Sequence, residues 1–179
     1  MPHVINVVEP TLMSQAGHCF SFVSALCKAS DERNTLRLWV GRHAELVFSE
    51  QNIEIRNYFF RRIRQVQSYW LYKKLLTTPE KLFISTAGRT NLILLDWSAK
   101  GVIPPEKVYL YFHWFNSSEK KLAALRMLAC KQPNLVIFCP TASLVKIFQD
   151  AGFAHARVVP YPVSPRTRDS QPVSSQFHH

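Results

Sequence analysis

The chain has 179 residues, of which 47% are hydrophobic and 19% are charged, and this balance excludes a disordered or collagen-like chain. The length suffices for one domain with a substantial core and is too short for two full Rossmann-like domains. The formal net charge of +10 indicates an anionic partner, such as a phosphate group, a membrane surface or a nucleic acid.

The sequence favours a cytoplasmic location. No stretch approaches the roughly 20 apolar residues that a membrane-spanning helix needs, and the first residues lack the pattern of a secretory signal. The four cysteines form no C-x-x-C pair and lie within apolar runs, which predicts buried free thiols and no metal site. They are Cys19, Cys27, Cys130 and Cys139.

Short apolar runs alternate with segments of helical period along the chain, and we count about seven strands and five helices. The expected strands cover residues 3–8, 36–40, 53–57, 81–85, 107–114, 135–139 and 156–159. The first helix is expected at about 18–29. Thr90 is expected to cap the third helix, Asn116 the fourth in a capping box with Glu119, and Thr141 the fifth.

The second helix is predicted from the spacing of Phe59, Ile63, Val66 and Trp70. They recur at i, i+4, i+7 and i+11, which places them within one narrow stripe of a helix. We expect this stripe to face the core and the arginines beside it to face solvent.

Strict alternation of strands and helices predicts an α/β fold, with a doubly wound, mainly parallel Rossmann-like sheet and helices on both faces. In such a sheet the ligand site lies beyond the carboxyl ends of the strands. The loops at 9–17, 87–90 and 113–118 are therefore the candidate site. Residues 1–163 are expected to form the domain. Residues 164–179 are rich in Pro, Ser and Arg, and are expected to form a linker or loose tail.

These loops and the start of the first helix contain five candidate site residues. Gly17 begins the first helix, where free backbone N–H groups bind anions, and His18 follows it. His113 ends an apolar strand and could donate a hydrogen bond to a ligand hydroxyl. Arg89 could meet a phosphate or carboxylate, and Asn116 lies beyond the same strand as His113. An ordinary strand-to-helix turn at Gly17, a core histidine at His113 and a solvated Arg89 remain open alternatives.

A basic segment lies between Glu54 and Glu80, where there is no acidic residue. Basic side chains beside aromatic ones suit an anionic membrane surface, so a peripheral position on the inner face of the membrane is one reading. A solvated basic face over a buried stripe is the other. The candidate membrane-surface residues are Arg61, Arg62, Arg64, Lys73 and Lys74.

The order of several loose motifs resembles one family. The segments EPTLMSQAGHCFSFVSAL, YLYFHWFNSSEK, NLVIFCPTASLVKIFQDAGF and ARVVPYPVSP follow one another as in the N-terminal domain of family 4-type glycosyltransferases of the GT-B fold. The resemblance covers about residues 3 to 163. It implies transfer of a sugar from a nucleotide sugar to an acceptor hydroxyl, in the synthesis of a cell-surface polysaccharide or glycolipid.

The resemblance also assigns roles to residues. It places Gly17 beside the donor phosphate or acceptor, His18 at the start of the helix that flanks the cleft, and His113 as the catalytic histidine that contacts the transferred sugar. It implies no cofactor, because the nucleotide sugar is a substrate. Family members hold this donor mainly in a second domain, through a basic pair and a Glu-x₇-Glu-type motif. This sequence has no two glutamates eight apart and no D-x-D. We therefore expect the chain to need a donor-binding domain, in cis or in trans.

Two alternative functions are compatible with the sequence. The chain could be a non-catalytic subunit of a split GT-B transferase that binds the acceptor or a membrane. It could also be a nucleic-acid-binding α/β module that uses its basic helix. The sequence lacks an RNP-like motif, zinc-finger spacing and a helix-turn-helix pattern, so charge alone supports this last reading.

Overall fold

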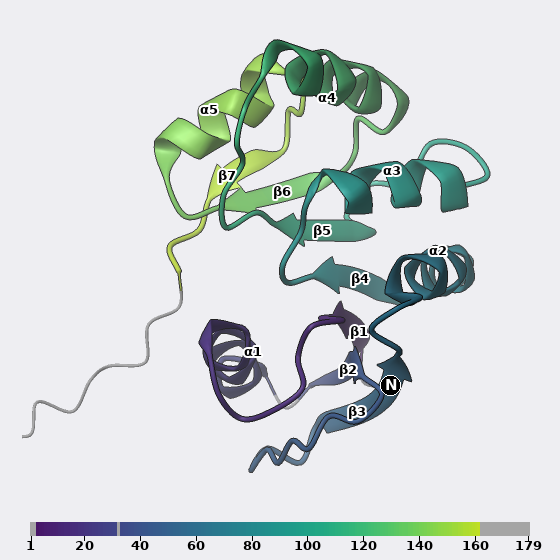
Figure 1. Cartoon of the computed structure of the whole chain (residues 1–179), viewed down its shortest axis with the longest axis vertical. Helices are drawn as coiled ribbons and strands as arrows, with labels where there is room; N and C mark the ends of the chain where they lie inside the picture. Colours follow the sequence, from purple (N-terminus) through teal and green to yellow (C-terminus); the bar gives the residue numbers. More distant parts are fainter. Residues whose placement is uncertain (1–2, 32, 162–179) are drawn as a thin grey trace, which may run out of the picture.

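A computed structural model describes residues 3–31 and 33–161. Within these ranges the chain forms one parallel sheet of seven strands with five helices, which confirms the predicted Rossmann-like α/β class (Figure 1). The expected tail at 164–179 lies outside the described residues. No helix in the described ranges is long and apolar enough to cross a bilayer.

Each predicted strand overlaps an observed one, and the ends differ by a few residues. The strands are β1 (His3–Val8), β2 (Asn34–Gly41), β3 (Ile53–Phe59), β4 (Lys81–Ile84), β5 (Val108–Tyr111), β6 (Val136–Cys139) and β7 (Ala156–Val158). The helices are α1 (His18–Lys28), α2 (Arg64–Leu75), α3 (Arg89–Ser98), α4 (Glu119–Lys131) and α5 (Ala142–Asp150).

The strand order is β3-β2-β1-β4-β5-β6-β7, and every neighbouring pair is parallel. The chain therefore adds β2 and β3 on one side of β1 and then returns to add β4 on its other side. This reversal is a topological switch point between β1 and β4, and the loops that leave these two strands turn to opposite faces of the sheet. Such a point opens a crevice at the carboxyl edge, where ligands bind in folds of this type.

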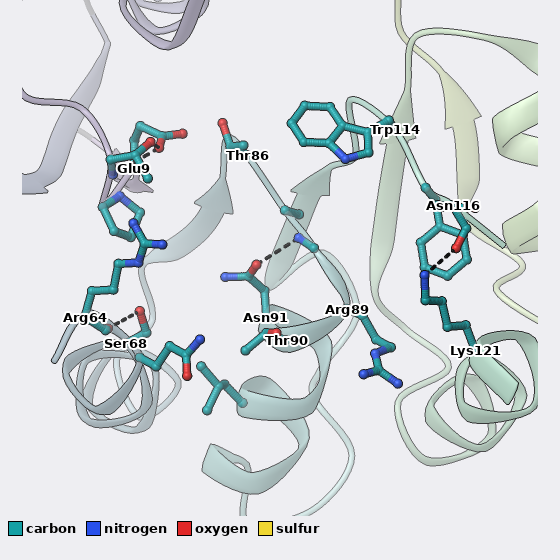
Figure 2. Close-up of a pocket in the computed structure, with 17 residues that line it drawn as sticks. Glu9, Arg64, Ser68, Thr86, Arg89, Thr90, Asn91, Trp114, Asn116 and Lys121 are labelled. Carbon is teal, nitrogen blue, oxygen red and sulfur yellow. Dashed lines mark hydrogen bonds between the residues drawn. The ribbon is translucent and has the colours of Figure 1, made fainter. Parts of the chain in front are cut away.

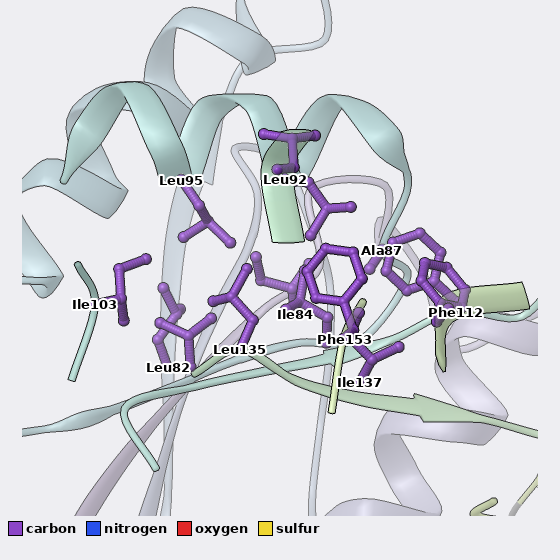
Figure 3. Packing of buried hydrophobic residues seen from close by; sticks show 14 of the residues in the cluster. Leu82, Ile84, Ala87, Leu92, Leu95, Ile103, Phe112, Leu135, Ile137 and Phe153 are labelled. Atoms are coloured by element: carbon purple, nitrogen blue, oxygen red, sulfur yellow. The ribbon is translucent and has the colours of Figure 1, made fainter. Parts of the chain in front are cut away.

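Helices cover both faces of the sheet, as predicted. One buried cluster joins α2, α3, α4 and α5 to side chains of the sheet such as Leu82, Ile84 and Ile137 (Figure 3). The other cluster joins α1 to Val7, Leu38 and their neighbours on the opposite face. Both faces of the central strands are apolar because both are covered, which explains why these runs do not alternate with polar residues.

The predicted orientation of α2 is wrong. Phe59 ends β3 instead of starting the helix, and Ile63, Val66 and Trp70 are exposed. The helix packs on the core through a different side, composed of Ser68, Leu71, Tyr72 and Leu75. Both sides of α2 are apolar, so its spacing alone could not show which one is buried.

Two predicted helix caps are also wrong. Thr90 lies inside α3, where Gly88 is the N-cap residue and its N–H donates to Asn91 Oδ1 at 2.8 Å. The N-cap of α4 is Ser118, whose hydroxyl accepts from the backbone N–H of Lys121, so Asn116 is free for another role. The cap at Thr141 is confirmed, since its hydroxyl accepts from Leu144 N.

The four cysteines are free, as predicted, but they are not all buried. Cys27 and Cys139 are buried, and burial raises the pKa of each thiol to about 12. Cys130 is exposed and Cys19 is half-buried. The apolar run around Cys130 misled the prediction because α4 turns this residue away from the sheet.

Candidate functional site

The three predicted loops meet at the carboxyl edge of the sheet, around the switch point. A cavity of about 430 Å³ lies there, between the loops that follow β1, β4 and β5 and the start of α2 (Figure 2). Its lining residues are Glu9, Pro10, Thr11, Arg64, Gln65, Ser68, Thr86, Ala87, Gly88, Arg89, Thr90, Asn91, Leu94, Trp114, Phe115, Asn116 and Lys121. Of the residues predicted from sequence to bind substrate, Arg89 and Asn116 line this cavity, and Arg64, which was predicted for a membrane surface, lines it as well.

Glu9 joins the two strands that flank the switch point. It follows β1 directly and is 1% exposed, and its Oε2 accepts a hydrogen bond of 2.7 Å from Ser85 Oγ at the end of β4. Its Oε1 accepts from Thr11 Oγ1 at 2.5 Å and from Thr11 N at 3.3 Å. Because both oxygens accept, the group is a carboxylate that holds the β1 loop against β4 and fixes one wall of the cavity.

The cavity contains cations that have no partner of their own. The side chains of Arg64 and Arg89 make no hydrogen bond or salt bridge with any residue in the described ranges, and Arg89 is exposed. Lys121 Nζ donates to the main-chain oxygen of Asn116 at 3.0 Å. Guanidinium groups without a partner are suited to bind phosphate or carboxylate oxygens.

An aromatic side chain stands at the mouth of the cavity. Trp114 is 66% exposed although it follows a buried strand, and Figure 2 shows its indole ring beside the cavity, opposite Arg64. An exposed tryptophan offers a flat apolar face with an N–H donor at its edge. Together with the polar groups of Asn116 and Thr86, it can bind a ligand that has both an apolar face and hydroxyl groups.

His113 lies on the other side of the same edge, against α1. Its Nε2 is 2.9 Å from the main-chain oxygen of Ser85. A carbonyl oxygen only accepts, so Nε2 carries the proton, and in the neutral ring Nδ1 is left as an acceptor. Burial lowers the pKa of His113, and the nearby His18 lowers it further, so the ring is neutral at pH 7. The expectation that this histidine donates to a ligand is therefore corrected, because its one N–H is already bonded.

Aromatic rings surround His113 and fix its position. Ring centroids of Tyr111, Phe22 and Tyr161 lie 4.8, 5.3 and 5.5 Å from its own. The ring of His18 is 6.1 Å away, edge-on. His113 is thus half-buried and held on several sides, with a structural role in the packing of α1, and it lies at the carboxyl edge outside the set of residues that line the cavity.

Gly17 and His18 begin α1, as predicted, but they lie outside the cavity. Gly17 is the N-cap residue with a φ of 88°, a conformation that favours glycine. The ring of His18 contacts Cys19 through Nε2 at 3.4 Å, and its main-chain oxygen accepts from Tyr161 at 2.7 Å. Thr11 connects the two halves of the edge, since it lines the cavity and its hydroxyl is 3.7 Å from Cys19 Sγ.

We compared the sequence with known proteins. No family model and no curated protein matches it. The chemistry of the carboxyl edge is thus the basis for any assignment. In the described ranges, no three His, Cys, Asp or Glu side chains are grouped as metal ligands would be.

Sequence reasoning found the loops but missed several of their residues. Glu9, Ser85 and Trp114 were not predicted as site residues, although each comes directly after a predicted strand or at its end. Their position at strand ends could have identified them from sequence, because side chains at the carboxyl ends of the strands face the crevice in a parallel sheet. The contact between Glu9 and Ser85 joins residues 76 apart in the chain, and no local pattern reveals it.

Proposed function

We propose that this chain is the N-terminal, acceptor-side half of a GT-B glycosyltransferase, which transfers a sugar from a nucleotide sugar to an acceptor hydroxyl. The observation that carries the proposal is the cavity at the switch point, where a tryptophan face, unpaired arginines and hydroxyl-binding groups occur together. The sequence motifs that resemble the GT-B family provide the loops that form it.

The cavity is suited to a saccharide acceptor. The face of Trp114 can pack against the C–H face of a sugar ring, while Asn116 and Thr86 offer donors and acceptors for its hydroxyls. The volume of about 430 Å³ is in the range of small-molecule pockets and can hold one or two sugar units. The acceptor would reach this cavity from the open carboxyl edge of the sheet.

His113 would contact the transferred sugar from the opposite side of the edge. Its neutral ring has Nδ1 free as an acceptor, so it can receive a hydrogen bond from a sugar hydroxyl. The bond from Nε2 to Ser85 O and the surrounding rings hold it in one orientation. A group positioned in this way contributes by orienting the substrate, without reorganisation during the reaction.

Negative charge develops on the leaving diphosphate during transfer. Arg64 and Arg89 are the unpaired cations nearest to the crevice, and they can stabilise that charge from the acceptor side. The proposal places most of the donor contacts in a second domain, linked to this chain or supplied by another protein. Closure of that domain over the carboxyl edge would exclude water from the reacting groups.

The proposal is tested by ligand titration of the full chain followed by amide NMR. The probes are methyl glycosides and disaccharides of common hexoses, and UDP-glucose and GDP-mannose as donors. We expect saccharides to shift Asn116, Thr86 and the Trp114 indole, and nucleotide sugars to bind with dissociation constants no better than about 1 mM. Trp114→Ala should abolish the saccharide shifts, and Trp97→Ala, which removes an exposed tryptophan from α3, should leave them unchanged.

Two results would contradict the proposal. Micromolar affinity for a nucleotide sugar would mean that the donor site is in this chain and that the halves are assigned the wrong way round. Saccharide shifts that are absent, or that persist in Trp114→Ala, would remove the cavity as the acceptor site.

A further inference from the structure

We propose that the outer face of α2 binds the surface of an anionic lipid bilayer. This outer face consists of Ile63, Val66 and Trp70 with the flanking Lys73 and Lys74, and it lies on the side of the helix away from the sheet. The inference goes beyond the proposed function and does not depend on it.

The first observation is that α2 has two apolar sides. Leu71, Tyr72 and Leu75 are buried against the core. Ile63, Val66 and Trp70, spaced i, i+3 and i+7, are 50%, 58% and 57% exposed. At about 100° per residue the two sets lie on opposite sides of the helix. The outer set is a contiguous apolar stripe of a kind that marks interaction sites on soluble domains.

The second observation is that the charged side chains next to this stripe are all cations. Lys73 and Lys74 flank it near the end of the helix, and Lys73 Nζ lies 5.2 Å from the Trp70 ring centroid. Arg61 and Arg62 are exposed just before the helix. Lysines and arginines around a tryptophan and aliphatic residues are the composition of helices that lie in the membrane interface.

The acidic groups that bound the basic segment, and the one on the neighbouring helix, are already paired. Glu54 and Glu80, which bound the basic segment, both accept from Arg37, at 2.9 and 3.1 Å. Asp96, on the neighbouring α3, is bonded to Lys131 and to Gln132. The positive charge around the stripe therefore has no anionic partner in the described ranges, and it favours an external anion.

The combination of charge and apolar surface distinguishes a bilayer from other partners. A second copy of this chain would bring the same face against itself in a two-fold interface, so the lysines of both copies would be close together and would repel. A nucleic acid would use the cations but would leave the aliphatic part of the stripe unburied. An anionic bilayer satisfies both, because phosphates meet the cations and the acyl region receives the apolar side chains.

The surface continues beyond the helix and connects to the cavity. Phe60 is 46% exposed, and the Arg42 guanidinium lies 5.7 Å from its ring centroid, at the carboxyl ends of β2 and β3. Arg64 and Gln65, in the first turn of α2, line the cavity described above. A bilayer bound to the outer face would therefore lie beside the opening of the candidate site.

The test is co-sedimentation of the full chain with vesicles of phosphatidylcholine alone and with vesicles that contain phosphatidylglycerol, together with tryptophan fluorescence. We expect binding to the anionic vesicles only, a blue shift of the emission, and weaker binding at high salt. Ile63→Ser with Trp70→Ser, and separately Lys73→Glu with Lys74→Glu, should each weaken binding at least tenfold.

Matched controls remove equivalent groups elsewhere. Trp97→Ser removes a tryptophan that is 67% exposed, and Lys120→Glu with Arg126→Glu reverses two exposed cations on α4. These controls should bind within about twofold of the parent chain, and circular dichroism should show all variants folded, since every altered side chain is exposed. Equal binding to both vesicle types, or binding unaffected by the α2 variants, would overturn the inference. So would a dimer in light scattering that Trp70→Ser dissociates.

Discussion

His113→Ala provides the sharpest test of the site geometry. The substitution removes the hydrogen bond from Nε2 to Ser85 O, which contributes about 1 kcal/mol to the free energy of unfolding. It also removes edge contacts with Tyr111 and Phe22, which contribute about 0.5–1 kcal/mol each. We therefore expect a loss of about 2–3 kcal/mol at pH 8 and a fall in Tm of about 5–10 °C.

The loss should depend on pH, because burial lowers the pKa of His113 below its ordinary value of 6.5 in the folded chain. In the unfolded chain this histidine takes up a proton near pH 6.5, whereas in the folded chain it does so at lower pH. The stabilisation by the neutral ring is thus complete above pH 6.5, and it is lost as the pH falls from 6.5 through the lower pKa that His113 has in the folded chain. The difference between the parent chain and His113→Ala should shrink from about pH 8 to about pH 5.

Urea unfolding followed by circular dichroism, repeated across this pH range, measures both effects. His155→Ala is the matched control, because His155 is exposed and its side chain makes no hydrogen bond in the described ranges, so its effect should stay within about 0.5 kcal/mol. A loss below about 0.5 kcal/mol for His113→Ala, or a difference that grows toward acid pH, would refute the assigned proton on Nε2 and the neutral ring.

Two further predictions concern the loop that follows β1. Glu9→Gln should lower the free energy of unfolding in urea by about 2 kcal/mol, because the side chain of glutamine has only one acceptor oxygen and cannot accept from both Ser85 and Thr11. The control Glu45→Gln, at an exposed position, should lower it by less than about 0.5 kcal/mol. Equal effects of the two variants would mean that Glu9 does not fix the wall of the cavity. Gly17→Ala should cost about 1–3 kcal/mol, because a φ of 88° with a ψ of 174° is essentially restricted to glycine, although its Cβ would meet nothing within 4 Å. Gly101→Ala, which is equally open and has no positive φ, should be nearly neutral, and a similar Tm for both would exclude strain at Gly17.

Local patterns in the sequence suffice to predict the fold class and the loops that form the candidate site. Apolar runs such as 135–139 and capped helices such as α5 are local patterns, and their alternation permits few arrangements other than a parallel sheet with crossover helices. Once the sheet is parallel, every strand ends at the same edge. The loops that contain Arg89, His113 and Asn116 were therefore identifiable from sequence.

Which side chains meet and which faces are buried depends on long-range packing, which local patterns do not contain. Glu9 and Ser85 come together because β4 is added beside β1, and the order of the strands is a long-range property that periodicity does not contain. The helix α2 is apolar on two sides, and the spacing of its apolar residues does not show which side packs against the rest of the fold. Contact with α3 and the sheet buried Leu71 and Leu75 and left Trp70 outside, because a helix on a sheet surface can bury one side only.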